Sequence, residues 1–209
     1  MQTPATNLVA RAGWAGVLAG PVLALSVGVE LAFDVQRPDG TVTEPAVFTA
    51  LLGLWFLGTA GIAGTVVGLR QVHSDAGRQL PRLGRAGVRV TLAGCLLLLA
   101  FPVLGGLTAA VSGKPAEIVF LPFGVGFLCL IAGGALLGGV VRRASLLRPA
   151  TRVLWLGAVS ALAALAVPAD PWHDLALFTF DATWTVLGLL LLRQATRAAG
   201  PALREEISA

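Results

Sequence analysis

Long apolar stretches alternate with short polar segments along this chain. Six stretches reach or approach the roughly 20 apolar residues that a helix needs to cross a bilayer. They cover residues of about 12–33, 46–69, 87–111, 117–141, 152–168 and 175–192. We interpret the first as a helix rather than a signal peptide, because no small-x-small cleavage site follows its apolar core. The pattern predicts an all-α, polytopic membrane protein whose six transmembrane helices form one bundle.

The segments between these stretches are short. None exceeds about 17 residues, so we expect no separate soluble domain. We predict a single six-helix transmembrane domain over residues 1–192. Residues 193–209 are expected to form a cytoplasmic tail, either as a short surface helix or without order.

Composition supports a membrane protein rather than a soluble one. Hydrophobic residues make up 56% of the chain and charged residues only 12%, against about 25% in a typical soluble domain. The mean hydropathy is +0.83 and the sequence pI is about 10.4. The basic residues stand in short blocks between apolar stretches, which is typical of membrane topology. We therefore expect membrane lipid, and no nucleic acid, as a partner.

The basic residues also predict an orientation. Only Arg37 and Lys114 fall in segments on one side of the predicted membrane. The other thirteen of the fifteen fall on the opposite side: Arg11, Arg70, Arg78, Arg82, Arg85, Arg89, Arg142, Arg143, Arg148, Arg152, Arg193, Arg197 and Arg204. Because cytoplasmic loops carry the excess of Lys and Arg, we predict a bacterial cytoplasmic membrane protein with both termini inside.

Asp181 is the first candidate for chemistry, because it lies within the last apolar stretch. It stands twelve residues before Arg193, ~18 Å along a helix and in the outer half of the membrane. Helical spacing places five residues on one stripe: Asp174, Phe178, Asp181, Thr185 and Gly188. Trp184 lies beside this stripe. A carboxyl group in a membrane helix usually faces the interior and has a partner or a function. The alternative is a structural hydrogen bond to a Thr or to the backbone of a neighbouring helix.

A second set of candidates lies at the outer ends of the helices. Glu30 and Asp34 are one turn apart at the end of the first stretch, and Trp172 and His173 precede the last. With Asp174 they predict an outward-side acidic and aromatic site for a hydrophobic small molecule. The alternatives are a solvated helix end, an interfacial tryptophan and an exposed histidine. The carboxyl oxygens with one imidazole would also suit a hard or borderline cation. No ligand spacing indicates a metal, however, so we predict no metal and no cofactor.

Prolines are expected to loosen the outer half of the bundle. Pro21, Pro102, Pro122 and Pro168 interrupt four of the predicted helices at or beyond mid-depth. Kinks separate helices and free backbone carbonyls. We therefore expect an outward-opening cleft lined by Asp181, Glu30 and aromatic residues.

Three pairs of glycines have the spacing that lets helix backbones approach closely: Gly16/Gly20, Gly64/Gly68 and Gly134/Gly138. We interpret them mainly as packing positions within one chain. A homodimer through the same positions is the alternative.

The two cysteines are not expected to form a disulfide. Measured from the basic residue that bounds each predicted helix, Cys95 lies at ~9 Å and Cys129 at ~20 Å. These values place the two thiols at different depths, so we interpret both as small core residues.

Glu30 and Asp181 are acidic residues in the first and last predicted helices, and they are the basis of a resemblance to one known family. With its small size and high helix content, the chain faintly resembles the integral-membrane terpene cyclases. That resemblance implies that Asp181 and Glu30 donate the proton that starts cyclisation of an isoprenoid. Through G-P-V-L at 20–23 and its Arg-rich loops, the chain also looks like small six-helix bacterial membrane proteins of actinobacterial type, which have no assigned activity.

Three functions remain open from the residues alone. The first is acid-catalysed conversion of a lipid-soluble substrate, since a carboxyl group in an apolar site favours its protonated form and aromatic faces stabilise a carbocation. The second is a small transporter coupled to protons or cations through Asp181 and Glu30. The third is a non-catalytic membrane scaffold or sensor.

Overall fold

The computed structural model describes residues 4–33, 44–75, 77, 80–112, 114, 118, 120–144, 148–166 and 171–208. These residues form six helices: α1 (Pro4–Phe33), α2 (Pro45–Asp75), α3 (Arg82–Ser112), α4 (Phe120–Ala144), α5 (Arg148–Ala166) and α6 (Trp172–Ser208). Each helix is long and apolar enough to cross a membrane. The predicted all-α class and the six apolar helices are therefore confirmed for the described part of the chain.

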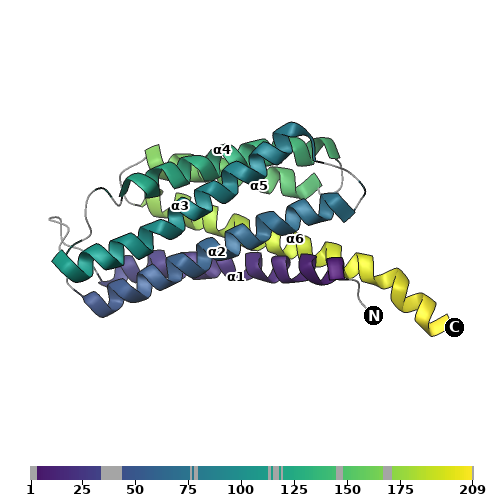
Figure 1. The fold of residues 1–209 in the computed structure, drawn as a ribbon, viewed down its shortest axis with the longest axis horizontal. Helices are drawn as coiled ribbons and strands as arrows, with labels where there is room; N and C mark the ends of the chain where they lie inside the picture. The colour runs from purple at the N-terminus through teal and green to yellow at the C-terminus, as the bar shows by residue number, and fades with distance from the viewer. Residues whose placement is uncertain are drawn as a thin grey trace.

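The six helices lie side by side and pack in chain order. Each helix contacts the next one, and α6 returns to pack along α1, where contact is most extensive (Figure 1). A further contact joins α2 to α6. One apolar core therefore receives residues from all six helices, among them Leu23, Val66, Leu98, Leu137 and Leu187.

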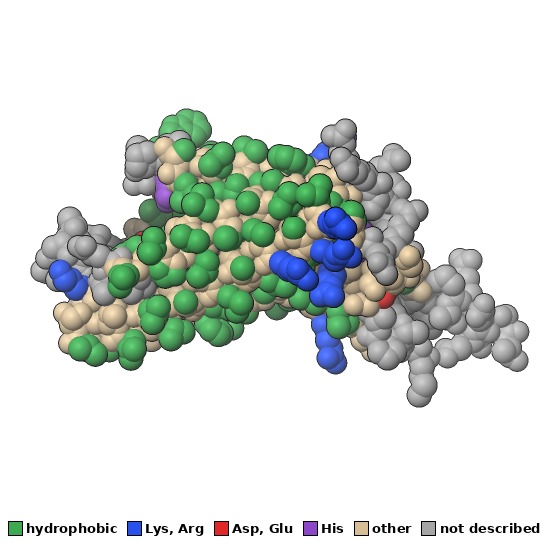
Figure 2. Space-filling model, turned by 45° about the horizontal axis from the view of Figure 1, so that its top comes forward, with side chains coloured by type: hydrophobic (Ala, Val, Ile, Leu, Met, Phe, Trp, Pro, Cys, Tyr) green, Lys and Arg blue, Asp and Glu red, His purple; other side chains and the backbone are tan. Residues whose placement is uncertain are grey.

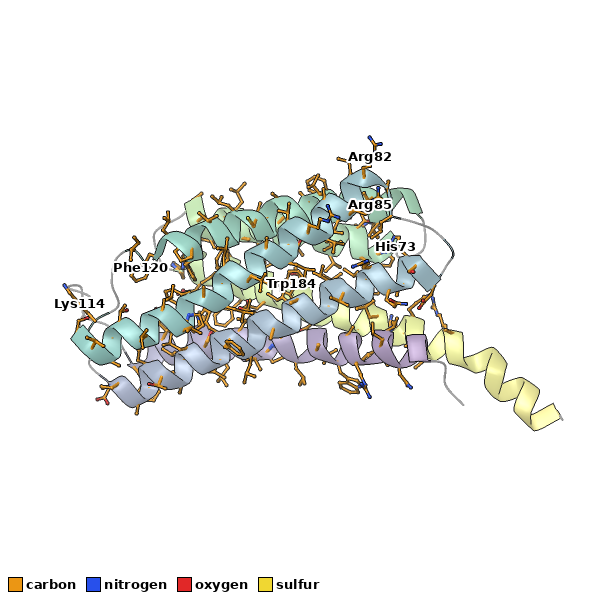
Figure 3. The ribbon with its side chains drawn as sticks, viewed as in Figure 1. His73, Arg82, Arg85, Lys114, Phe120 and Trp184 are labelled. Carbon is orange, nitrogen blue, oxygen red and sulfur yellow. The ribbon has the colours of Figure 1, made fainter. Side chains whose placement is uncertain are left out.

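The two ends of the molecule differ in charge. Arg82, Arg85 and His73 lie near one end, whereas Lys114 and Phe120 lie near the other (Figure 3). We call these the arginine end and the Lys114 end. Helix α1 begins and α6 ends at the arginine end (Figure 1). Between the ends, the face shown in Figure 2 is covered by hydrophobic side chains, as suits contact with lipid.

Prolines mark several helix starts. Pro45 is the first residue of α2, Pro149 the second of α5, and Pro171 directly precedes α6. A first-turn residue needs no intrahelical partner for its N–H, so proline costs nothing there. The predicted interruption at Pro122 is wrong for the same reason, because Pro122 lies in the first turn of α4.

The interruptions predicted at Pro21 and Pro102 are not found either. Both α1 and α3 continue through their internal prolines, Pro21 and Pro102. Pro168 lies outside the described residues. The helices also extend beyond the predicted stretches at the arginine end, and α6 continues through residues 193–208 as one helix.

Glycines bring α1 and α6 into backbone contact. A Cβ on Gly188 would lie 2.5 Å from the carbonyl oxygen of Gly13 and still closer to the amide nitrogen of Val17. A Cβ on Gly20 would overlap Thr185 and lie 2.5 Å from the carbonyl oxygen of Asp181. Only residues without a side chain allow helices to approach this closely.

The other two glycine pairs pack in the same manner on different helices. Gly68 meets Ala12 of α1, and Gly138 meets Trp155 of α5. The prediction that these motifs pack helices within one chain is confirmed. Association of two chains stays a prediction.

The cysteines are free, as predicted, but the argument from depth was wrong. A Cβ on Gly94 would lie 2.9 Å from the Cβ of Cys129, so Cys95 and Cys129 are close in depth. The error came from the reference residue. Helix α3 begins at Arg82 and not at Arg89, which adds seven residues, ~10 Å, to the depth of Cys95.

Candidate functional site

A partly open cavity of about 270 Å³ lies toward the Lys114 end of the molecule. All six helices contribute to its wall: Val27, Glu30, Phe48, Leu51, Leu52, Trp55, Phe101, Phe120, Phe123, Phe127, Ala164, Leu165, His173 and Leu177. Three of these residues, Glu30, Phe120 and Leu165, are exposed and mark the mouth. The cavity is therefore a mostly apolar chamber with a few polar groups, which is the usual composition of a small-molecule site.

Six aromatic rings from α2, α3 and α4 form a large part of the wall. Phe123 is central: its ring centroid lies 5.5 Å from that of Trp55, 4.9 Å from Phe101 and 5.1 Å from Phe127. The rings meet at interplanar angles of 51° to 66°, close to the edge-to-face arrangements that aromatic pairs prefer. The rings of the wall therefore pack against one another across three helices.

The local sequence of α4 explains much of this wall. Phe120, Phe123 and Phe127 follow one another at intervals of three and four residues, so one face of the helix carries all three. That face turns toward α2 and α3, which supply Trp55 and Phe101.

Two lining side chains are ionisable, Glu30 and His173. Glu30 comes from the last turns of α1 and His173 from the first turn of α6. The carboxyl of Glu30 lies within electrostatic range of His173 and of Asp174. The packing of α6 along α1 thus brings a carboxyl and an imidazole to the mouth of one aromatic cavity.

His173 also holds two helices together. Its Nδ1 lies 2.9 Å from the carbonyl oxygen of Ala164, near the C-terminal end of α5. Since a carbonyl can only accept, Nδ1–H is the donor and satisfies one of the last carbonyls of that helix. Nε2 is then the ring nitrogen that carries the lone pair in neutral His173.

Asp181 lies deeper than this site and is not among the residues that line the cavity. It is 4% exposed, and its Oδ2 has no hydrogen-bond partner among the described residues. Its backbone carbonyl contacts Gly20, which is ten residues, ~15 Å along α1, from Glu30. The structure therefore brings Glu30 to the cavity and leaves Asp181 in the core beneath it.

Among the described residues, two other buried polar atoms near this depth have no hydrogen-bond partner: Thr59 Oγ1 and Trp184 Nε1. Thr59 follows Gly58, which meets Leu23 of α1, so its depth is within about one turn of Gly20 and hence of Asp181. Trp184 lies near the middle of the molecule (Figure 3). Its ring contacts Phe180, which contacts Phe127 of the cavity wall. A row of contacting aromatic rings thus connects the cavity wall with Trp184.

The remaining predicted site residues are dispersed. Thr185 packs against Gly20 on α1. Phe178 and Trp172 are 37% and 66% exposed and lie on the outer surface, outside the cavity wall. Asp174 is half-buried beside the site, within range of Glu30. Asp34 lies outside the described residues.

Sequence reasoning missed the aromatic wall. A signal was present in the spacing of Phe120, Phe123 and Phe127, but Trp55 and Phe101 join them only through the packing of three helices. Among the described residues, no group of three or more His, Cys, Asp or Glu side chains is placed to hold a metal ion.

The fold and the site define a class: a six-helix apolar protein with an aromatic cavity and a carboxyl–imidazole pair at its mouth. No family model, curated protein or solved structure matches the chain.

Proposed function

We propose that this chain is a multi-pass protein of the bacterial cytoplasmic membrane that binds a lipid-soluble small molecule in its aromatic cavity. In this proposal the six helices form one bundle, with the arginine end and both termini in the cytoplasm. The gathering of Lys and Arg near one end of an apolar surface supports that orientation (Figure 2). A reporter enzyme that is active only outside the cytoplasm should work when inserted at Lys114 and fail when fused to the C-terminus.

The observation that carries the proposal is the cavity itself. Its volume of about 270 Å³ is just below the ~300–1,000 Å³ typical of ligand pockets. Apolar and aromatic side chains form nearly all of the wall, and only Glu30 and His173 are ionisable. A compact hydrophobic molecule with one polar or charged group matches this composition.

Acid catalysis is a second candidate, favoured by the position of Glu30 among aromatic rings. A protonated Glu30 would transfer its proton to an alkene carbon of an isoprenoid, and the ring faces would stabilise the carbocation that results. Loss of a proton from a neighbouring carbon to His173 Nε2 would end the reaction. In this scheme Glu30 alone is the proton donor, because Asp181 does not line the cavity.

A cavity-filling substitution tests the proposal against a matched control. Leu177 lines the cavity, whereas Leu175 is exposed on the same helix and does not line it. We expect Leu177→Trp to weaken binding of a neutral hydrophobic probe, such as neopentylbenzene, at least tenfold in lipid nanodiscs. Leu175→Trp should leave the affinity unchanged. Equal affinity in all three proteins, or no saturable binding, would contradict a ligand site and leave the scaffold alternative.

A further inference from the structure

We propose that the preferred ligand of this cavity is a small lipophilic organic cation, such as a quaternary ammonium carrying an aromatic or alkyl group. This inference rests on the proposed function, since it names the class of ligand for the same cavity.

The polar groups at the cavity favour a positive ligand. Glu30 supplies the carboxylate among the lining residues, and neither lysine nor arginine lines the cavity. Because Nδ1–H of His173 is occupied by Ala164, neutral His173 can offer only the Nε2 lone pair. When Glu30 is ionised, both groups act as acceptors, and an anionic ligand finds no donor in these side chains.

The surrounding charges reinforce this preference. Asp174 lies within electrostatic range of Glu30 and adds a second carboxylate beside the mouth. Among the described residues, Lys114 is at the same end of the molecule but does not line the cavity, and Arg82 and Arg85 lie near the opposite end (Figure 3). Among the described residues, the ionisable groups at the mouth are therefore two carboxyls and one imidazole, with no lysine or arginine.

The aromatic wall favours an organic cation over a metal ion. Ring faces carry negative quadrupole potential and attract a cation within about 6 Å of the centroid. Six rings line the cavity, whereas no group of three metal-ligating side chains occurs among the described residues. Rings bind alkylated ammonium well because its charge is spread over methyl groups that also bury apolar area. A hydrated metal ion would lose most of its water and gain only the Glu30 carboxylate among the lining residues as an oxygen ligand.

The volume sets a limit on size. A cavity of about 270 Å³ leaves room for a compact ligand. Benzyltrimethylammonium is a suitable probe, and neopentylbenzene is its neutral counterpart, with carbon in place of nitrogen. Any difference in affinity between the two then reports the charge alone.

The test measures both probes against three proteins in nanodiscs: the native chain, Glu30→Gln and Glu44→Gln. Glu44 is an exposed carboxyl just before α2 and does not line the cavity, so its substitution is the matched control. We expect the native chain to bind the cation at least tenfold more tightly than neopentylbenzene. Glu30→Gln should remove that preference and leave neopentylbenzene unaffected, and Glu44→Gln should change neither affinity.

A spectroscopic readout locates the cation. N-methyl protons that lie over ring faces should move upfield in NMR spectra, and Phe123→Leu should reduce that shift. Equal binding of the two probes, or an unchanged cation affinity in Glu30→Gln, overturns this inference while the proposed function stands. Failure of both probes to bind overturns the two proposals together.

Discussion

Glu30 and Asp181 are both acidic residues of apolar helices, but they meet different surroundings. Glu30 stands at the mouth of a cavity, near an imidazole and a second carboxylate. Asp181 is buried against α1, and its Oδ2 has no partner among the described residues. Burying a polar group without a hydrogen bond costs free energy, and it costs more when the group is charged. We therefore propose ligand contact for Glu30 and expect the burial of Asp181 to cost stability.

Asp181→Asn tests this difference. The amide has the same shape and no charge, so the free energy of unfolding should stay equal or rise by about 1–3 kcal/mol. Affinity for a cavity ligand should change less than threefold, because Asp181 does not line the cavity. Reversible unfolding in bicelles gives the first quantity and probe binding the second.

Glu44→Gln provides the control, since an exposed carboxyl should alter the stability by less than about 0.5 kcal/mol. A loss of more than 1 kcal/mol in Asp181→Asn would show instead that the carboxylate is held by a favourable contact.

At the scale of helices, the contact between α1 and α6 positions the site. It joins the helix that carries Glu30 to the helix that carries His173. The closest approach is at Gly188, where a side chain would meet the backbone of Gly13 and Val17. Backbone cannot move aside as a flexible side chain can, so the two helices must separate if Gly188 is enlarged.

We expect Gly188→Ala to lower the free energy of unfolding by about 2–3 kcal/mol and to weaken ligand binding through the displaced helices. The matched control is Gly53→Ala on α2, where an added Cβ has no neighbour within 4 Å. There alanine should be neutral or stabilise by up to about 1 kcal/mol, because glycine is the poorer helix former. Equal stabilities for the two variants would mean that the α1–α6 contact is looser than the structure shows.

Much of the helical organisation was predictable from sequence, because the length and apolar content of a span are local properties. The spacing of glycine pairs such as Gly16 and Gly20 likewise predicts close helix packing. The relative depth of the cysteines was not predictable from one basic residue per helix. Arg89 lies two turns inside α3 rather than at its start, so the predicted depth of Cys95 was too shallow. Pro122 was misjudged because its effect depends on where α4 begins.

The site was only partly predictable. Glu30 and His173 could be selected as polar residues at outer helix ends, and the structure places both at the cavity. Phe178 shares a stripe with Asp181 on a helical wheel, but the position of α6 against α1 leaves it half on the surface. Trp55 and Phe101 come from different helices, and their meeting depends on how α2, α3 and α4 pack. The meeting of these rings depends on tertiary packing, and no local sequence pattern predicts it.

At the scale of the whole molecule, the candidate site lies toward one end and the arginines lie near the other. The aromatic cavity and its carboxyl–imidazole pair lie toward the Lys114 end, while arginines gather at the opposite end (Figure 3). In the proposed orientation a molecule dissolved in the outer half of the membrane reaches the cavity without crossing the bilayer. The central claim is therefore that a lipid-soluble molecule occupies this cavity in a membrane.

Photo-crosslinking in a bilayer tests that claim most directly. A benzyl ammonium probe carrying a diazirine would be activated by light on the protein in nanodiscs, and mass spectrometry would map the modified residues. The account predicts crosslinks on cavity residues such as Phe123, Phe127 and Leu177, which unlabelled benzyltrimethylammonium competes away. Crosslinks spread over exposed side chains such as Leu96 and Leu128, with no loss on competition, would contradict it.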